Sequence, residues 1–240
     1  MYQKQFQLTG ILVLLSILIS SCWFLGPSIK GNRNVTEKTR QVDEFDRIKV
    51  SRGMNVYITQ GSPAKVVVIA DSNLHEVIET KVDGGVLKIT VKENIRSAKE
   101  KKVMVTIDKL SGVEATSGGN AWSQSPIMSE NLDLKATSGG NLTMELNAKL
   151  LRVDCSSGAN IRLSGLAKEA ELKTSSGGNL KGEALKADHC NMRASSGGNV
   201  SSTVIDKLDA KASSGGNIVY YGEPKSTNVN SSSGGNIRRK

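Results

Sequence analysis

The chain has 240 residues and a net charge of +9, with 32 Lys and Arg against 23 Asp and Glu. Aromatic residues make up only 4% of it while glycine occurs 24 times, which disfavours a compact core built on large rings and favours an elongated fold. Basic and aromatic residues are not interleaved as they are in proteins that stack bases, so we expect no nucleic-acid partner.

The first 21 residues have the pattern of a secretory signal peptide. Lys4 supplies a short positive segment, and residues 8–19 form an apolar run that is too short to span a bilayer comfortably. The sequence Leu18-Ile19-Ser20-Ser21-Cys22 resembles the lipobox of bacterial lipoproteins. That resemblance implies cleavage before Cys22 and its lipidation, which would attach the chain to a membrane. An ordinary signal peptide with an incidental cysteine is the alternative.

The stretch from Pro27 to about Asp43 is polar with little periodicity, which predicts that residues 22–43 are a lipid-anchored tether to the folded part. From residue 44 to 110 the apolar and polar residues alternate as in strands. We expect an antiparallel β cap here, because a solenoid needs its apolar end covered. Asp83-Gly84-Gly85 predicts a hairpin turn. The expected strands cover residues 48–50, 54–58, 64–70, 78–82, 86–91 and 103–107.

The tetrapeptide Ser-Gly-Gly-Asn recurs along the second half of the chain. Six copies are intact, and a seventh, Ser157-Gly158-Ala159-Asn160, is degenerate. The period is about 19 residues, and self-similarity at such a period is the mark of a solenoid. The asparagines that close the seven copies are Asn120, Asn141, Asn160, Asn179, Asn199, Asn217 and Asn236.

Alignment on these asparagines reveals columns. The positions one residue after, five before and seven before each Asn are apolar or small in nearly every copy, and the positions between them are polar. Because side chains alternate across a strand, one face of each copy is buried and the other is exposed. The glycines are expected to permit positive φ or close backbone approach at a corner, and Ala159 indicates that the second glycine is not strictly required.

Together these patterns predict an all-β fold. The N-terminal antiparallel cap, residues 44–110, is expected to run into a right-handed parallel β-helix of about seven coils over residues 111–240. Residues 1–21 would be the signal peptide and residues 22–43 the tether.

Two cysteines, Cys155 and Cys190, remain besides Cys22. They belong to coils two steps apart, roughly 9–10 Å at about 4.8 Å per layer, whereas a disulfide needs Cα atoms within about 7 Å. We therefore expect two buried free thiols. His189 and Cys190 are neighbours on a strand and face opposite ways. His75 is the one other histidine, and no carboxylate column persists, so we expect no catalytic residue, no metal site and no cofactor.

The Ser-Gly-Gly-Asn array is first of all a turn motif. It lacks the Asp of calcium-binding β-rolls, and no Gly-Lys-Ser/Thr follows its glycines, so neither a calcium nor a phosphate site is expected. A ladder of hydroxyls and of the seven Asn amides could nevertheless dock a polymeric glycan. These asparagines are the binding candidates that the sequence offers.

The whole pattern resembles the family called putative auto-transporter adhesin, head GIN domain. The resemblance rests on Phe45-Asp46-Arg47-Ile48-Lys49-Val50, on Val56-Tyr57-Ile58-Thr59-Gln60-Gly61, on Gly85-Val86-Leu87-Lys88-Ile89, on the Ser-Gly-Gly-Asn corners and on Val219-Tyr220-Tyr221-Gly222-Glu223-Pro224. It joins residues 44–237 in one domain. The family name implies adhesion and supplies no functional residues.

These observations predict a non-enzymatic, lipid-anchored envelope protein whose solenoid is a binding or structural surface with an adhesive role. Its partner would be a glycan or a cell-surface protein. A carbohydrate-active β-helix enzyme or a polysaccharide-binding module is the alternative. The expected location is the outer membrane, with the periplasmic face favoured because Trp23-Phe24-Leu25-Gly26 after Cys22 lack an acidic run. The sequence leaves the oligomeric state open.

Overall fold

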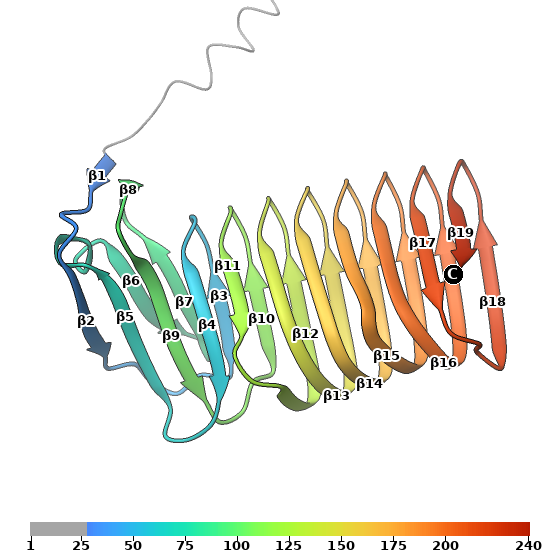
Figure 1. Cartoon of the computed structure of the whole chain (residues 1–240), viewed down its shortest axis with the longest axis horizontal. Helices are drawn as coiled ribbons and strands as arrows, with labels where there is room; N and C mark the ends of the chain where they lie inside the picture. The colour runs from blue at the N-terminus through green and yellow to red at the C-terminus, as the bar shows by residue number, and fades with distance from the viewer. Residues whose placement is uncertain (1–27) are drawn as a thin grey trace, which may run out of the picture.

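The structure, a computed structural model, describes residues 28–240. The predicted signal peptide and Cys22 lie outside the described residues. Within them the chain is built of strands, with one 3₁₀ turn, η2 (Ser72–Leu74), and no helix is long and apolar enough to cross a membrane. Figure 1 shows a row of coils stacked side by side, with the N-terminal region at one end and the C-terminus at the other.

Ten strands form the solenoid after residue 111. All their pairings are parallel, which confirms the predicted parallel solenoid of about seven coils. The strands are β10 (Gly112–Ala115), β11 (Asn120–Ser123), β12 (Ile127–Ala136), β13 (Asn141–Cys155), β14 (Asn160–Thr174), β15 (Asn179–Ala194), β16 (Asn199–Ala212), β17 (Asn217–Tyr221), β18 (Ser226–Ser231) and β19 (Asn236–Arg239).

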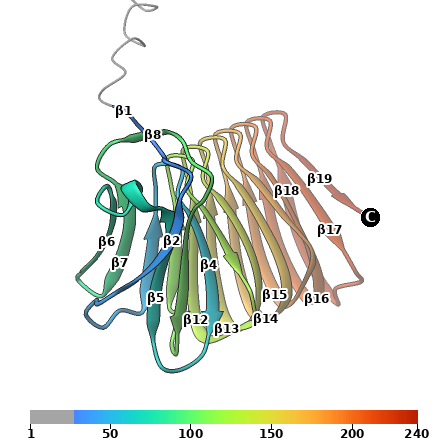
Figure 2. The same cartoon turned by 60° about the vertical axis from the view of Figure 1, so that its left-hand side comes forward.

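Each coil has two sides. A long strand such as β13 begins at the Asn of one corner and continues round a bend to the next corner, so a tight turn closes one edge and a smooth bend the other (Figures 1 and 2). We call the side that follows each corner wall A and the side that leads into each corner wall B. The seven asparagines align in one file on wall A.

The core between the walls is aliphatic. The column one residue after the asparagines, from Leu142 through Ile161, Leu180 and Val200 to Ile218, is at most 2% exposed. No aromatic side chain is among the buried residues of the described chain. The low aromatic content is therefore sufficient, because each coil buries only a thin slice of Val, Leu, Ile, Ala and Met against its neighbours.

Every corner is a type I′ turn. In the first Ser-Gly-Gly-Asn copy Ser117 has φ 49° and Gly118 φ 72°, and Gly119 N–H donates to Thr116 O at 2.9 Å. Positive φ at both central residues defines this turn. Gly118 N–H also donates to Ser138 O of the next coil at 3.2 Å, and the same bond recurs from corner to corner. The serine thus occupies the left-handed region that the sequence analysis assigned to glycine.

The second glycine is needed for close approach rather than for positive φ. A Cβ placed on Gly119, Gly140, Gly178 or Gly216 would lie under 3.0 Å from a backbone carbonyl of the preceding coil. Real Cβ atoms do not come so close, so an added methyl group would force the layers apart. Ala159 occupies this position in one coil, fully buried, and the interlayer bond from Asn160 N–H to Gly140 O is kept at 3.0 Å.

The solenoid begins one coil earlier than the Ser-Gly-Gly-Asn motif. β3 (Arg47–Val50) and β4 (Asn55–Gln60) pair in parallel with β10 and β11. Between them Arg52 (φ 54°) and Gly53 (φ 69°) form an eighth type I′ corner that ends at Asn55. Met54 stands where the other corners carry the second glycine and is fully buried. No tight corner lies beneath it in the cap, so its side chain has room.

The cap extends both walls and contains the predicted antiparallel sheet. On wall B, β7 (Val86–Val91) pairs with β3 and forms a hairpin with β6 (Ile78–Asp83). On wall A, β9 (Lys101–Ile107) pairs with β4 and, antiparallel, with β5 (Lys65–Asp71). Gly84 and Gly85 have positive φ, as the hairpin prediction requires.

The described part of the expected tether is not an irregular segment. β2 (Val35–Arg40) adds antiparallel to the free edge of β5, and β1 (Ser28–Lys30) pairs with β8 (Asn94–Ser97). The tether prediction for residues 22–43 was therefore wrong for these strands. Edge strands can be polar because backbone pairing, rather than an apolar face, holds them.

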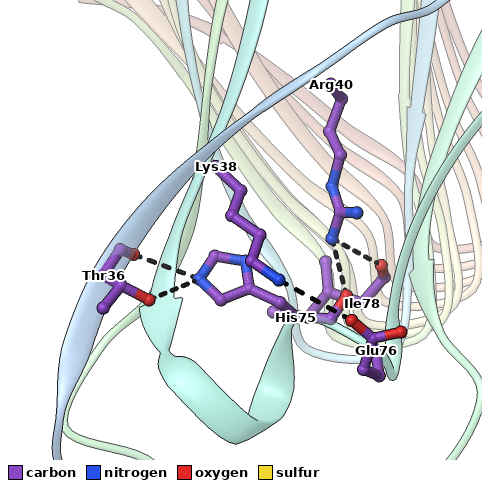
Figure 3. A network of polar contacts seen from close by, with 6 residues as sticks. All are labelled: Thr36, Lys38, Arg40, His75, Glu76 and Ile78. Carbon is purple, nitrogen blue, oxygen red and sulfur yellow. Dashed lines mark hydrogen bonds and ion pairs between the residues drawn. The ribbon is translucent and has the colours of Figure 1, made fainter.

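His75 links β2 to the loop after η2 (Figure 3). Its ring is 1% exposed, and its Nε2 lies 3.0 Å from Thr36 Oγ1 and 3.2 Å from Thr36 O. Arg40 donates to His75 O at 2.6 Å, and Lys38 pairs with Glu76 at 3.7 Å. Burial lowers the pKa of His75 below its ordinary value; the Thr36 contact and Glu76 oppose this shift, and Lys38 and Arg40 reinforce it.

We predict that the cap loses stability as the pH falls below about 6.5. Above that pH the ring is neutral in both states, and below it the unfolded chain binds a proton that the folded one resists. The urea concentration at the unfolding midpoint should be lower at pH 5.5 than at pH 7.5. The His75→Gln variant should show much less of this pH dependence. His189→Gln, at an exposed position, is the control. An unchanged pH dependence in His75→Gln would contradict this account.

Candidate functional site

The predicted Asn candidates form a file beside the corner edge that is hydrogen-bonded at its two ends, and Asn55 joins it as an eighth member. Asn120 Nδ2 donates to Asn55 Oδ1 at 3.0 Å, Asn141 to Asn120 at 2.8 Å and Asn160 to Asn141 at 3.1 Å. The amide chain resumes only at the far end, where Asn236 donates to Asn217 at 3.0 Å. Among the described residues, no side-chain bond of this kind joins Asn160, Asn179, Asn199 and Asn217.

In the first coils these amides are occupied by the fold. The second Nδ2 hydrogen of Asn120 goes to Gly118 O and that of Asn141 to Gly139 O, both at 3.1 Å. Both donors of these two side chains are therefore used to hold the corner. The file brings the asparagines together as predicted, but its first coils have no free amide donors for a glycan.

A second column lies two residues further along wall A; it faces outward from Tyr57 to Lys181, whereas Ser201 and Val219 further along are buried. It contains an aromatic pair: the rings of Tyr57 and Trp122 stack with centroids 4.9 Å apart and planes inclined by 17°. Both rings are partly exposed, as is every other aromatic side chain of the described chain. We call this set the wall A column; from the first coil to the last it contains Tyr57, Trp122, Thr143, Arg162, Lys181, Ser201, Val219 and Arg238.

The sequence analysis missed the aromatic pair. Tyr57 and Trp122 both stand two residues after a corner asparagine, and that shared position is the signal that would have found them. The corner before Tyr57 carries Arg52 and Met54 instead of Ser and Gly, so the repeat alignment did not reach it.

Wall B has a different character. Its outward residues are charged and pair across the layers: Lys49 with Glu114 at 3.0 Å, and Arg152 with Asp133 at 3.7 Å and Glu171 at 3.9 Å. A shallow hollow of about 630 Å³ lies over these strands. Three of its carboxylates, those of Glu114, Asp133 and Glu171, pair with bases. The fourth, Asp154, lies between Lys135 and Lys173 in its row, so the hollow contains no isolated acid pair of the kind that acid–base catalysis uses.

The thiols and histidines do not form a reactive pair. Cys155 and Cys190 are free and buried, as predicted, and His189 is exposed on the opposite face from Cys190. Burial raises the pKa of Cys155 to about 11 and that of Cys190 to about 12. Such thiols are poor nucleophiles at neutral pH. Across residues 28–240 no group of three or more His, Cys, Asp or Glu side chains could hold a metal ion.

We predict that Asn141 stabilises the solenoid and that Asn179 does so much less. Asn141→Ala loses three side-chain hydrogen bonds, to Asn120, Gly139 and Asn160, and should reduce stability by about 1–3 kcal/mol. Asn179→Ala, at the same position two coils on, should change it by less than about 0.5 kcal/mol. The shift of the urea midpoint measures both; equal losses would show that the amide file does not support the corners.

The fold matches solved structures of bacterial proteins. A putative adhesin from Bacteroides fragilis NCTC 9343 has 21% identity and a TM-score of 0.81 over 88% of this chain and 100% of that chain. A putative adhesin from Parabacteroides merdae ATCC 43184 has 20% identity and a TM-score of 0.67 over 90% of this chain and 100% of that one. A putative lipid binding protein from Parabacteroides distasonis ATCC 8503 has 19% identity and a TM-score of 0.66 over 89% of this chain and 100% of that chain.

At these identities the likeness shows the fold alone. Among curated proteins none matches the chain. The family model described as putative auto-transporter adhesin, head GIN domain, matches residues 44–224, which is most of the chain and agrees with the resemblance noted in the sequence. The chain therefore belongs to the putative auto-transporter adhesin, head GIN domain family.

Proposed function

We propose that this protein is a lipoprotein, anchored through Cys22, whose solenoid acts as a non-enzymatic binding surface with an adhesive role at the cell envelope. Family membership supports the adhesive role and a place in the envelope or at the surface. The lipobox-like sequence before Cys22 supports the anchor. The partner that fits this proposal is a glycan or a cell-surface protein.

One observation carries the binding role: Tyr57 and Trp122 stack on the outside of a fold whose core uses no aromatic residue. Exposed aromatic side chains are enriched at recognition surfaces, because they offer a large rigid contact area with few rotatable bonds. The pairing of charges on wall B supports a surface without catalysis. We place the anchor in the outer membrane, with the periplasmic face favoured by the absence of acidic residues just after Cys22.

The anchor is tested by metabolic labelling with a fatty acid. Cys22→Ser should abolish the label and release the chain from the membrane fraction, because no other lipid attachment site is expected. Cys190→Ser, which removes a different thiol, should keep both the fatty-acid label and the association with the membrane fraction. Protease treatment of intact cells then reports the membrane face: protection means the periplasmic side. A labelled Cys22→Ser protein would contradict the anchor.

The binding role is tested with the purified full chain on arrays of glycans and matrix proteins and on whole cells. We expect saturable binding to at least one of these surfaces. Absence of binding on all of them would overturn the adhesive role.

A further inference from the structure

The wall A column changes from apolar to basic within five coils. Its order is Tyr57, Trp122, Thr143, Arg162 and Lys181, with no acidic member. Met104 of β9 lies beside Tyr57 in the same outward row and extends the apolar part into the cap. The change from ring to hydroxyl to cation takes place at Thr143.

The aromatic rings stand upright on the sheet. Two rings lying flat and side by side could not bring their centroids to 4.9 Å with planes inclined by only 17°, so the rings stack face to face along the solenoid axis. Trp122 then covers one face of Tyr57, and Met104 is the neighbour of Tyr57 in the row on the other side. The second face of Trp122 points toward the next coil, where the neighbour in the column is Thr143.

The side chain of Thr143 is shorter than those of Trp122 and Arg162, its two neighbours in the column, and we call the position above it the notch. These two residues are two layers apart, or roughly 9–10 Å at about 4.8 Å per layer. A flat ring needs about 3.5–4.0 Å to its neighbour on each side. This spacing is long enough for one sugar ring above Thr143, between the layers of Trp122 and Arg162.

The cations beyond the notch are available to a ligand. Arg162 and Lys181 are exposed, and neither forms an ion pair within residues 28–240, whereas Arg152 on wall B is paired twice. Two exposed acids lie close by: Glu145, two residues beyond Thr143 on its strand, and Glu183, two residues beyond Lys181 on the next. Arginine suits a carboxylate because its planar fork donates two parallel hydrogen bonds.

We infer that the notch at Thr143 binds a carboxylated pyranose unit of an acidic polysaccharide. Trp122 packs against the apolar face of the sugar ring, Thr143 bonds a ring hydroxyl, and Arg162 with Lys181 pairs with the carboxylate. This rests on the proposed binding function and names its ligand class.

The test measures binding of the purified full chain to three polymers. Polygalacturonate supplies both the ring and the charge, its methyl ester supplies the ring alone, and polyglutamate supplies the charge alone. We expect polygalacturonate to bind at least about tenfold more tightly than either of the others, because only it has both a sugar ring to pack against Trp122 and a carboxylate to pair with Arg162. Vesicles of anionic phospholipid form a fourth arm.

Variants locate the contact. Trp122→Ala should weaken polygalacturonate binding by at least about tenfold, as for a central aromatic anchor. Thr143→Tyr should abolish it by filling the notch, with the urea midpoint unchanged or raised because the aromatic stack is extended. Glu145→Gln should strengthen it. Arg162→Gln should weaken it, whereas Arg193→Gln, an exposed arginine on wall B with the same loss of charge, should leave it nearly unchanged.

Three outcomes would overturn the inference. Equal binding of polyglutamate, or equal weakening by Arg193→Gln, would mean that net charge alone attracts the polymer. Binding only to the vesicles, lost in Trp122→Ala, would assign the column to a lipid surface. Failure to bind polygalacturonate while the arrays or cells show saturable binding would reject this ligand and leave the adhesive function standing.

Discussion

The close approach of backbones at the corner edge is the constraint on which the other features depend. Where a corner has the second glycine, that residue lies so near a carbonyl of the preceding coil that a methyl group would overlap it; among the seven copies of the motif only Ala159 has a methyl group there. Ser and the first glycine take positive φ to make the turn, and the first glycine then bonds the serine carbonyl of the next coil. Layer spacing therefore continues through the corner without a break, and the register of the parallel ladders shifts only away from the corners, within the β14–β15 and β15–β16 pairings.

Because the stacking is regular, the core and the two walls contain different kinds of side chains with different roles. Since thin slices of Leu, Val, Ile and Ala fill the interior, the core does not need aromatic side chains. On wall B, charged side chains form ion pairs with residues of neighbouring layers. In the first coils, the asparagine amides donate hydrogen bonds to neighbouring asparagines and to corner carbonyls. The recognition surface that we propose is the column on wall A where two rings, a threonine and two cations follow one another at layer spacing.

The sequence predicted the repeating part of the fold because like residues recur in columns, and a column is stronger evidence than one alternating strand. It did not predict that Ser117 and its counterparts take positive φ, since serine enters that region only when the surrounding bonds impose it. It missed the corner at Arg52-Gly53-Met54, because no corner beneath requires a second glycine there. It also missed the edge strand β2, which is held by backbone pairing that leaves little trace in side-chain pattern. The alignment of the asparagines in one file followed from the repeat, whereas the aromatic pair beside it depends on the register of a corner that has no motif.

A matched pair of alanine substitutions tests the corner constraint most directly. Gly139→Ala adds a methyl group at φ 71° with nothing within 4 Å, so only the backbone penalty of about 1–2 kcal/mol applies. Gly140→Ala places the methyl group against Ala115 O and should cost about 2–3 kcal/mol more by forcing the coils apart. The measurement is the urea unfolding midpoint of the two variants beside the parent. A much lower midpoint for Gly140→Ala is the predicted result, and equal midpoints, or a lower one for Gly139→Ala, would contradict the account.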